Sequence, residues 1–354
     1  MGINEPALFL KYRSLVNDAL ITKLIEGETE LDQVLQYSLG IDAHESAEYL
    51  ISARSGKRIR PILCMFVCEL MGGNIKDILH ISVAIELIHQ FSLIHDDIQD
   101  RDVMRHHKSS VWVLYGDMKA LFAGNALRTT ADITAWDSNF CNNNRLDVGD
   151  LLNNACLRMT EGQCLDLLYE GELFTHIDQY IEMISLKTGA LVSASMEIGA
   201  CVSLKGCMYR DVFKSIGMYM GIILQIRDDM LGIWGDPDNT GKAIGSDIKR
   251  KKNTIPVVHT MAVAEKQDRK ELLRIYNKPE LTNQDVLQVL DIMDDLKTLE
   301  FTQNILKRYL DKTEGLVNKV SDDVSGIEDI LAVSYTHLRA HETDSYLVCR
   351  LLLE

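Results

Sequence analysis

The apolar residues of this chain recur every three or four positions over long stretches, and this spacing constrains its fold more than any other feature. It is clearest in Ile81–Ile94 and Tyr180–Ile198, where it indicates helices. Alternating apolar and polar residues, which would predict strands, are scarce, and the 354 residues include only 5 prolines. The pattern therefore predicts an all-α protein, one large domain built around a helical bundle.

Polar and glycine-rich segments mark the expected helix boundaries. A helix is expected to begin near Pro61, because proline is favourable in a first turn. Arg101–Ser110 is polar and predicts a loop, whereas Val111–Asp137 and Tyr180–Val202 each predict one continuous helix. The segment Gly235–Gly241 combines glycine, proline and aspartate and predicts a turn.

The end of the chain differs from the rest. Tyr335–Glu354 lacks a continuing helical pattern, and Ser334–Thr343 resembles translated sequencing-adapter sequence. We therefore expect one domain over residues 1–333, and a non-native tail over residues 334–354 that contributes nothing to function.

The charge and the cysteines exclude several kinds of partner. A formal net charge of −15 does not suit nonspecific nucleic-acid binding or an anionic membrane. The 8 cysteines form no CxxC pair, which is typical of reduced thiols in a cytoplasmic protein. No signal peptide is recognisable, and we expect no apolar run that reaches the roughly 20 residues needed to span a bilayer. We expect a cytoplasmic protein without nucleic-acid binding or membrane insertion.

An acidic cluster ends the nearly uncharged stretch Ile81–Ile94. It reads His95-Asp96-Asp97-Ile98-Gln99-Asp100, so Asp96 and Asp100 share one helical face. Like charges at this spacing repel, and a helix C-terminus disfavours anions. A bound cation would remove both penalties, and carboxylate oxygens suit Mg²⁺. The alternative is an acidic helix end that simply faces solvent.

A second acidic pair, Asp228-Asp229, follows another apolar stretch, Ile216–Leu224. Gln225 lies four residues before Asp229 and shares its face. If the two helices face each other, the two clusters form a carboxylate-lined cleft. The pair of clusters is far more specific than either cluster alone.

Two basic segments accompany the acidic ones. Gly56-Lys57-Arg58-Ile59-Arg60-Pro61 lies beside an expected helix start, where backbone N–H groups and the helix dipole favour a phosphate. Arginine offers phosphate a two-pronged fork, and lysine acts as a point charge. Gly241-Lys242 and Lys249–Lys252 follow the second acidic pair. Taken alone, each basic segment could be a solvated charge run.

The order of these motifs resembles the trans-isoprenyl diphosphate synthase, or polyprenyl synthetase, family over about Leu50–Pro256. The resemblance is carried by GKRIRP (56–61), HDDIQD (95–100), GQxLDL (162–167), KTGAL (187–191), QIRDDMLGIWGD (225–236) and GKAIGSDIKRKKNTIP (241–256). It implies an all-α isoprenoid synthase-type bundle of antiparallel helices around a central active-site cavity, usually as a homodimer. It also implies prenyltransferase activity: isopentenyl diphosphate is condensed with an allylic diphosphate to give a short all-trans prenyl diphosphate.

The resemblance also implies roles for single residues. Three Mg²⁺ ions per site are expected, bound by Asp96, Asp100 and Asp228 with support from Asp97 and Asp229; these five acids and Lys187 are the expected catalytic group. Isopentenyl diphosphate is expected at Gly56, Lys57, Arg60, His89 and His106. The allylic diphosphate is expected at Arg105, Lys187, Thr188, Gln225, Lys242 and Lys252.

Three positions depart from the family pattern. His106 stands where a second arginine is usual, and histidine is mostly neutral at pH 7 and cannot form the same fork. Asn125 replaces the acid of a usual Gly-Asp pair, and the second acidic motif ends in Gly232. The last feature resembles a subgroup of the family.

Product length in the family depends on residues just before the first acidic motif. Here these are Phe91 and Ser92, and one aromatic beside a small residue resembles enzymes that make geranylgeranyl diphosphate, with farnesyl diphosphate next. The alternative for Phe91 is an ordinary core position.

Two other functions share these motifs. A class I terpene cyclase would use the same metal chemistry, but it does not need the isopentenyl site at Lys57, Arg60 and His89. A non-catalytic subunit of a synthase would not need intact acidic motifs.

Overall fold

The computed structural model describes residues 7–24, 27, 29–43, 49–51, 56–105, 108–137, 142–170, 176–236, 243–321, 326–327 and 330. The described part is predominantly helical, which confirms the prediction of an all-α fold. The chain divides into two compact units, and each is described by itself. The N-terminal unit comprises Glu5–Cys156 and Ala194–Lys214; the C-terminal unit comprises Met1–Asn4, Leu157–Ser193 and Ser215–Glu354.

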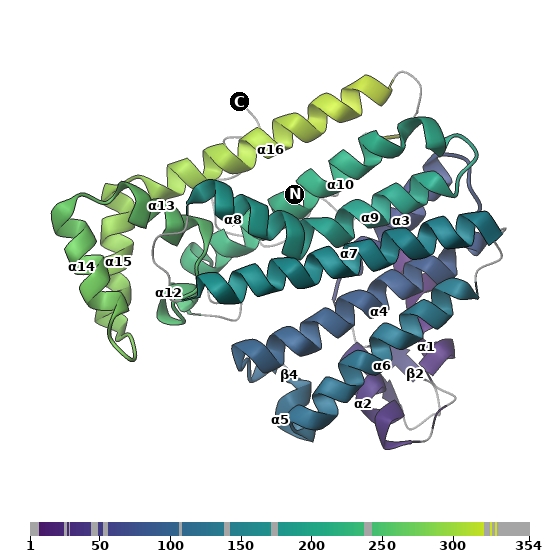
Figure 1. The fold of residues 1–354 in the computed structure, drawn as a ribbon, viewed down its shortest axis with the longest axis horizontal. Helices are drawn as coiled ribbons and strands as arrows, with labels where there is room; N and C mark the ends of the chain where they lie inside the picture. The colour runs from purple at the N-terminus through teal and green to yellow at the C-terminus, as the bar shows by residue number, and fades with distance from the viewer. Residues whose placement is uncertain are drawn as a thin grey trace. The chain divides into compact units, whose positions relative to one another are not determined.

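The N-terminal unit is built mainly from the first helices of the chain (Figure 1). These are α1 (Ala7–Leu24), α2 (Glu30–Leu39), α3 (Ile59–Leu70), α4 (Ile75–Asp100), α5 (Val111–Tyr115), α6 (Asp117–Trp136), the first half of α7 (Asn142–Tyr169) and the 3-10 helix η2 (Gly206–Tyr209). Two short antiparallel pairs join them: β1 (Ile41–Ala43) with β2 (Tyr49–Ile51), and β3 (Met104–Arg105) with β4 (Lys108–Ser109).

Helices α3 and α4 form the centre of this unit. Every residue of α3 from Pro61 to Cys68 is buried, and α4 packs against both α3 and α6. Full burial of a large aliphatic side chain contributes roughly 1.5–3 kcal/mol, so these helices supply much of the unit's stability. Gly124 allows α6 to approach α4, because a Cβ at this position would lie 2.3 Å from Nε2 of His95.

One expectation from the sequence is wrong here. Helix α4 is long and apolar enough by composition to cross a membrane, although no such run was expected. However, 61% of its most apolar window is buried within the protein, and core helices of soluble proteins pass the same test. The absence of membrane insertion stays a prediction.

The C-terminal unit contains the later helices. These are α8 (Ile177–Ile184), the π-helical segment η1 (Ser185–Gly189), α12 (Ser246–Lys249), α13 (Ile255–Val263), α14 (Lys266–Tyr276), α15 (Asn283–Asp295) and α16 (Thr298–Ser321). Helices α7, α9 (Ala190–Cys201) and α10 (Arg210–Trp234) contribute residues to both units.

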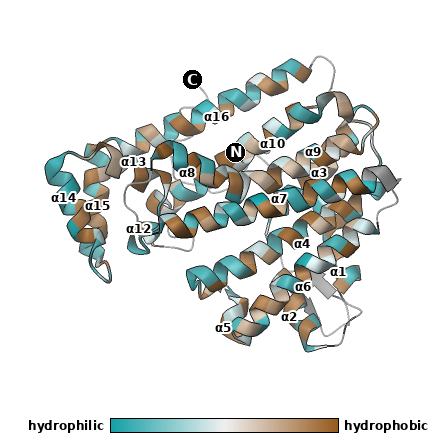
Figure 2. Ribbon diagram, in the orientation of Figure 1, coloured by the Kyte–Doolittle hydropathy of each residue, from teal (hydrophilic) through white to brown (hydrophobic). Residues whose placement is uncertain are grey.

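Apolar side chains from several helices form the core of the C-terminal unit. Ile222 and Ile226 of α10 pack with Met183 of α8, Ile255 of α13 and Leu306 of α16. Figure 2 shows hydrophobic and hydrophilic residues taking turns along α16, as expected of a helix with one buried face.

Three predicted boundaries differ from the structure. Gly116, with a φ of +84°, divides the expected helix Val111–Asp137 into α5 and α6. The predicted loop Arg101–Ser110 contains the β3–β4 pair. The expected helix Tyr180–Val202 is interrupted by η1, whose wider turns displace the residues that follow.

Candidate active site

The first acidic motif occupies the last turn of α4. Asp96 and Asp100 are partly exposed, whereas Asp97 is buried. Arg105 donates from Nε (2.8 Å) and Nη2 (2.6 Å) to Oδ1 of Asp97. Burial raises the pKa of Asp97, and the Arg105 guanidinium opposes that rise. Asp97 is therefore an anchored acid, and the two acids beside it are the more accessible ones.

The β3–β4 hairpin explains how Arg105 reaches α4. Arg101 ends the helix with a left-handed φ of 55°, and the N–H of Asp102 returns to the carbonyl of Asp97 at 3.0 Å. Trp112 donates from Nε1 to the carbonyl of Asp102 at 2.8 Å. Arg105 then pairs with Lys108 across the hairpin. His106 lies outside the described residues, so its expected role stays a prediction.

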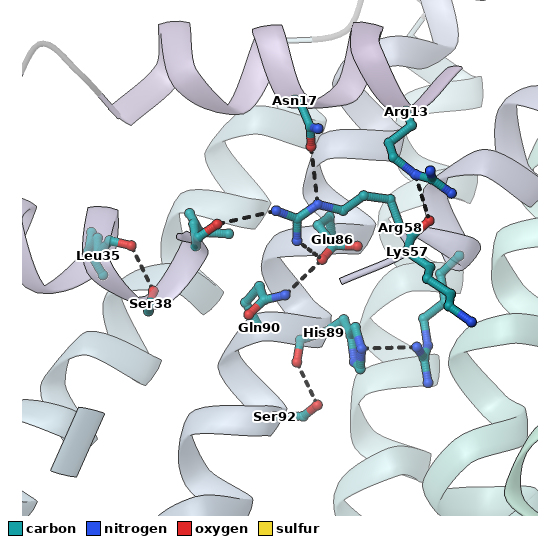
Figure 3. Close-up of polar contacts among 12 residues, drawn as sticks. Arg13, Asn17, Leu35, Ser38, Lys57, Arg58, Glu86, His89, Gln90 and Ser92 are labelled. Atoms are coloured by element: carbon teal, nitrogen blue, oxygen red, sulfur yellow. Dashed lines mark hydrogen bonds and ion pairs between the residues drawn. The ribbon is translucent and has the colours of Figure 1, made fainter. Parts of the chain in front are cut away.

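A cationic group lies at the start of α3, within the N-terminal unit. Arg60 Nη1 is 3.0 Å from Nε2 of His89 on α4 (Figure 3). Lys57 is exposed, and Gly56 before it has a φ of +103°. The structure thus brings together Arg60 and His89, two of the residues expected to bind isopentenyl diphosphate. The first N–H groups of α3 lie at the same end, where helices favour anions.

The sequence reasoning missed a buried ion pair beside this group. Nη1 of Arg58 lies 2.6 Å from Oε1 of Glu86, and both side chains are almost inaccessible, at 0% and 2% exposed. Gln90 donates to the same oxygen at 2.8 Å. One sequence signal could have revealed the pair: Glu86 is the single acid within the apolar stretch Ile81–Ile94.

The second acidic motif lies within α10, in the C-terminal unit. Asp228 is exposed, whereas Asp229 is buried. Asp229 accepts hydrogen bonds from the hydroxyl of Tyr180, from Nε2 of Gln225 (3.0 Å) and from the N–H of Ile255 (3.0 Å). Burial raises the pKa of Asp229 to about 7, and these three donors limit the rise.

The Asp229 network continues to the π-helical segment. Thr188 donates from Oγ1 to Oε1 of Gln225 at 2.7 Å, so Thr188, Gln225 and Asp229 form one hydrogen-bonded chain. Single π turns inside helices are frequent at functional sites. The structure therefore groups three of the residues that the sequence assigned to the allylic diphosphate and its metal.

Lys187 lies on the same segment and is paired with Asp166 of α7 at 2.6 Å. Gly162 permits this contact, because a Cβ there would lie 2.2 Å from the backbone nitrogen of Lys187. The motif GQxLDL thus supplies a close helix contact through its glycine and a carboxylate through Asp166, four residues later.

The basic loop before α13 is partly described. Lys252 is partly exposed, and its N–H donates to the carbonyl of Asp247 at 2.9 Å. It precedes by three residues Ile255, whose N–H binds Asp229. Lys242 lies outside the described residues, and its role stays a prediction.

The residues expected to set product length lie on α4. The rings of Phe91 and His95 meet edge to face, with centroids 4.8 Å apart. Ser92 donates to the carbonyl of His89 at 2.8 Å. Neither contact tests the expected role.

The accessible acids of each unit, taken separately, suit magnesium by their chemistry. In the part of the chain that the structure describes, no three His, Cys, Asp or Glu side chains form a ready-made metal cluster. Mg²⁺ does not require one, because it usually takes one or two carboxylates together with water and substrate phosphates. Asp96, Asp100 and Asp228 offer such hard oxygen ligands and are more accessible than the buried Asp97 and Asp229.

The sequence profile of the polyprenyl synthetase family matches residues 42–293, which is most of the chain. The chain belongs to this family. That confirms the resemblance seen in the motifs, and with it the expected trans-prenyltransferase activity at the level of the family.

Individual relatives agree with this assignment. A short chain isoprenyl diphosphate synthase from Methanocaldococcus jannaschii is 34% identical over 250 residues, which cover 71% of this chain and 76% of the relative. The solved structure of a geranylgeranyl pyrophosphate synthetase from Pyrococcus horikoshii matches with a TM-score of 0.83 and 28% identity. The match covers 94% of this chain and 98% of that one. The isoprenoid synthase-type fold is thereby confirmed.

A second solved structure was determined with ligands. It is a polyprenyl synthase from Caulobacter crescentus, complexed with calcium and isoprenyl diphosphate. It is 21% identical, with a TM-score of 0.80, covering 95% of this chain and 97% of that one. At this identity the likeness shows the fold alone.

Proposed function

We propose that this family member condenses isopentenyl diphosphate with an allylic diphosphate, and that its main product is geranylgeranyl diphosphate. The observation that carries the proposal is the repeated arrangement of the two acidic motifs. Each holds one buried acid through fixed donors and leaves a neighbouring acid accessible. Membership of the polyprenyl synthetase family and the names of the relatives support the substrate class.

In the proposed reaction, the allylic C–O bond breaks and its electron pair leaves with pyrophosphate. The double bond of isopentenyl diphosphate attacks the allylic carbocation, and a proton then leaves, with the departed pyrophosphate as its acceptor. A divalent metal, as found with the Caulobacter protein, would supply Lewis-acid stabilisation of the leaving group. We propose three Mg²⁺ ions per site, held by Asp96, Asp100 and Asp228.

The chain's own cations contribute in two places. Lys57, Arg60 and His89 would hold isopentenyl diphosphate near the reacting carbon, which raises the rate by proximity. Lys187 and Lys252 would stabilise charge that develops on the leaving pyrophosphate. Thr188 and Gln225 would orient that group through the hydrogen bonds that they already share.

A homodimer is proposed on the basis of an exposed apolar face. Large apolar side chains of α5 and α6 are 53–62% exposed: Leu114 on α5, and Met118, Phe122, Ile133 and Trp136 on α6. Contiguous exposed apolar patches mark interaction sites in soluble proteins. A second copy of the chain is the proposed partner.

The proposed location of the protein is the cytoplasm.

The deciding experiment incubates the purified protein with Mg²⁺, labelled isopentenyl diphosphate and each allylic primer. Twenty-carbon products are expected, and chelation of the metal should abolish them. Geranylgeranyl diphosphate supplied alone tests the alternative of a terpene cyclase, because hydrocarbon release requires cyclisation. The assembled Arg60–His89 group favours the synthase. A protein that forms no product by itself would instead indicate a non-catalytic subunit.

Product length is tested separately. Phe91→Ala should lengthen the products, because a smaller side chain would deepen the pocket floor. Chromatography of the dephosphorylated products measures chain length. An unchanged distribution would show that Phe91 is a core residue only.

A further inference from the structure

The buried ion pair Arg58–Glu86 is poorly explained by stability alone. Arg58 and Gln90 both donate to Oε1 of Glu86, while Oε2 is buried without a hydrogen-bond partner in the described part of the chain. Removing two charges from water is costly, and apolar residues of similar volume often replace such pairs without loss of stability. The pair therefore calls for a reason beyond holding the fold together.

The Arg58 guanidinium joins several elements at one point (Figure 3). Besides Glu86 on α4, it donates from Nε to Oδ1 of Asn17 on α1 (3.2 Å) and from Nη2 to the carbonyl of Leu39, the last residue of α2 (3.3 Å). Arg13 of α1 donates to the carbonyl of Lys57 at 3.3 Å. The turn before α3 is thus fixed from three helices.

The backbone at Arg58 needs this support. Arg58 precedes the first turn of α3 with a φ of 54° and a ψ of 36°, a left-handed conformation that a residue with a Cβ adopts at a cost. Ile59 then begins the right-handed helix. A left-handed residue followed by a right-handed one turns successive N–H groups toward one concave spot, a geometry that favours anions.

The side chains on either side of Arg58 belong to the group assigned to isopentenyl diphosphate. Lys57 is exposed immediately before it, and Arg60 contacts His89 two residues later. Glu86 and His89 both lie on α4, so the start of α3 is joined to α4 by a buried contact and a partly exposed one. A shift of the turn would displace Lys57, Arg60 and the N–H groups together.

We propose that Arg58 is a positioning residue for the diphosphate of the isopentenyl substrate. Its pairing with Glu86 holds the left-handed turn in the shape that presents Lys57, Arg60 and the backbone N–H groups to that diphosphate. Arg58 does not touch the substrate itself. This inference rests on the proposed function and adds a determinant of affinity for one of the two substrates.

The test uses the full-length protein and the double variant Arg58→Met/Glu86→Met, which removes both charges and fills the space with apolar side chains. Calorimetry measures binding of isopentenyl diphosphate, and kinetics measure KM for each substrate and kcat. We expect the Kd and KM for isopentenyl diphosphate to rise roughly tenfold or more, because small misplacements of binding groups are costly. The KM for the allylic primer should stay within about twofold of the wild type.

Glu197→Gln provides the matched control. Glu197 is another buried acid of the same unit, paired with Arg210 (2.7 Å) and Lys214 (3.3 Å), and it has no assigned role in binding. It should lower the melting temperature without changing the KM for isopentenyl diphosphate. Equal changes in both variants would reduce Arg58 to a structural residue and overturn the proposal.

Asn17→Ala tests the same idea without removing a buried charge, in case the double variant does not fold. It deletes one of the contacts of Arg58, and the KM for isopentenyl diphosphate should rise about two- to fivefold, in keeping with one lost hydrogen bond. Unchanged KM in every folded variant would refute the positioning role. If the wild type bound no isopentenyl diphosphate, the proposed function itself would fail first.

Discussion

Each of the two acidic motifs contains one buried aspartate, and the two aspartates are hydrogen-bonded by different kinds of donor. At the end of α4, the buried acid Asp97 is held by a charged group, Arg105. Within α10, the buried acid Asp229 is held by neutral donors: a hydroxyl, an amide and a backbone N–H. In both motifs the more accessible acids lie next to the anchored one. In each acidic pair, one carboxylate is thus buried and hydrogen-bonded, and the other is accessible to a ligand.

The largest expected effect tests that division directly. Asp96→Asn and Asp228→Asn should each lower turnover by roughly 100-fold or more, because each removes charge that the proposed metal requires. The melting temperature should hardly change, because neither acid is buried. Steady-state assays at saturating Mg²⁺ and thermal unfolding provide the two measurements. Near-normal turnover in either variant would exclude that acid as a metal ligand.

A second prediction separates the anchored acids by their partners. Asp97→Asn removes the carboxylate that pairs with the Arg105 guanidinium and should lower the free energy of unfolding by about 1.5–3 kcal/mol, as for hydrogen bonds to charged groups. Asp229→Asn replaces a carboxyl whose pKa is raised to about 7 by burial, among neutral donors, and should cost less. Urea unfolding compares the two free energies. Equal losses would show that the kind of partner does not matter.

Tyr180→Phe gives a smaller effect on the neutral network. It removes one donor from Asp229 and keeps the ring packed in its cluster, so the loss should be about 1 kcal/mol. The KM for the allylic primer should rise a few-fold, since Gln225 and Thr188 share the network. Tyr309→Phe is a matched control, because it also deletes a phenol hydroxyl from this unit. A KM that changes equally in both would contradict a specific role for Tyr180.

Asp285 shows what a purely structural acid should do. Lys278 and the Thr282 cap lower the pKa of Asp285 to about 2. A lowered folded pKa stabilises the protein above the unfolded value near 3.8, and that contribution disappears as the pH falls toward 2. Asp285→Asn should therefore be less stable than the wild type at pH 7. Near pH 2 the two proteins should be equally stable, and turnover should be unchanged at neutral pH. Lower turnover in this variant would show that Asp285 is not a purely structural acid.

The sequence predicted the helical class and the order of the motifs, because apolar spacing and acidic clusters are local properties. It did not predict the division at Gly116 or the β3–β4 hairpin that returns Arg105 to Asp97. Those features depend on a positive φ and on contacts between residues eight apart. Arg58 and Glu86 were missed for a related reason, since their pairing appears only when α3 lies on α4.

The anchoring of Asp97 and Asp229 also lay beyond the sequence. Both motifs contain two adjacent aspartates, and the amino-acid sequence does not indicate which of the two is buried. The tertiary neighbours decide it: Arg105 in one unit, and Tyr180 and Ile255 in the other. The pairing of the two motifs across one cavity stays a prediction, since each belongs to a different unit.

The contacts of Lys187 and Thr188 depend on the number of residues in the π turn Ser185–Gly189. A π turn accommodates one residue more than a regular turn, so the chain there carries a surplus residue within an otherwise continuous helix. Shortening the segment by one residue would let it relax into a regular α-helix and rotate everything on one side of the deletion. After such a deletion, Lys187 could not keep its contact with Asp166 while Thr188 kept its contact with Gln225. A one-residue deletion would therefore break contacts of residues that are themselves unchanged.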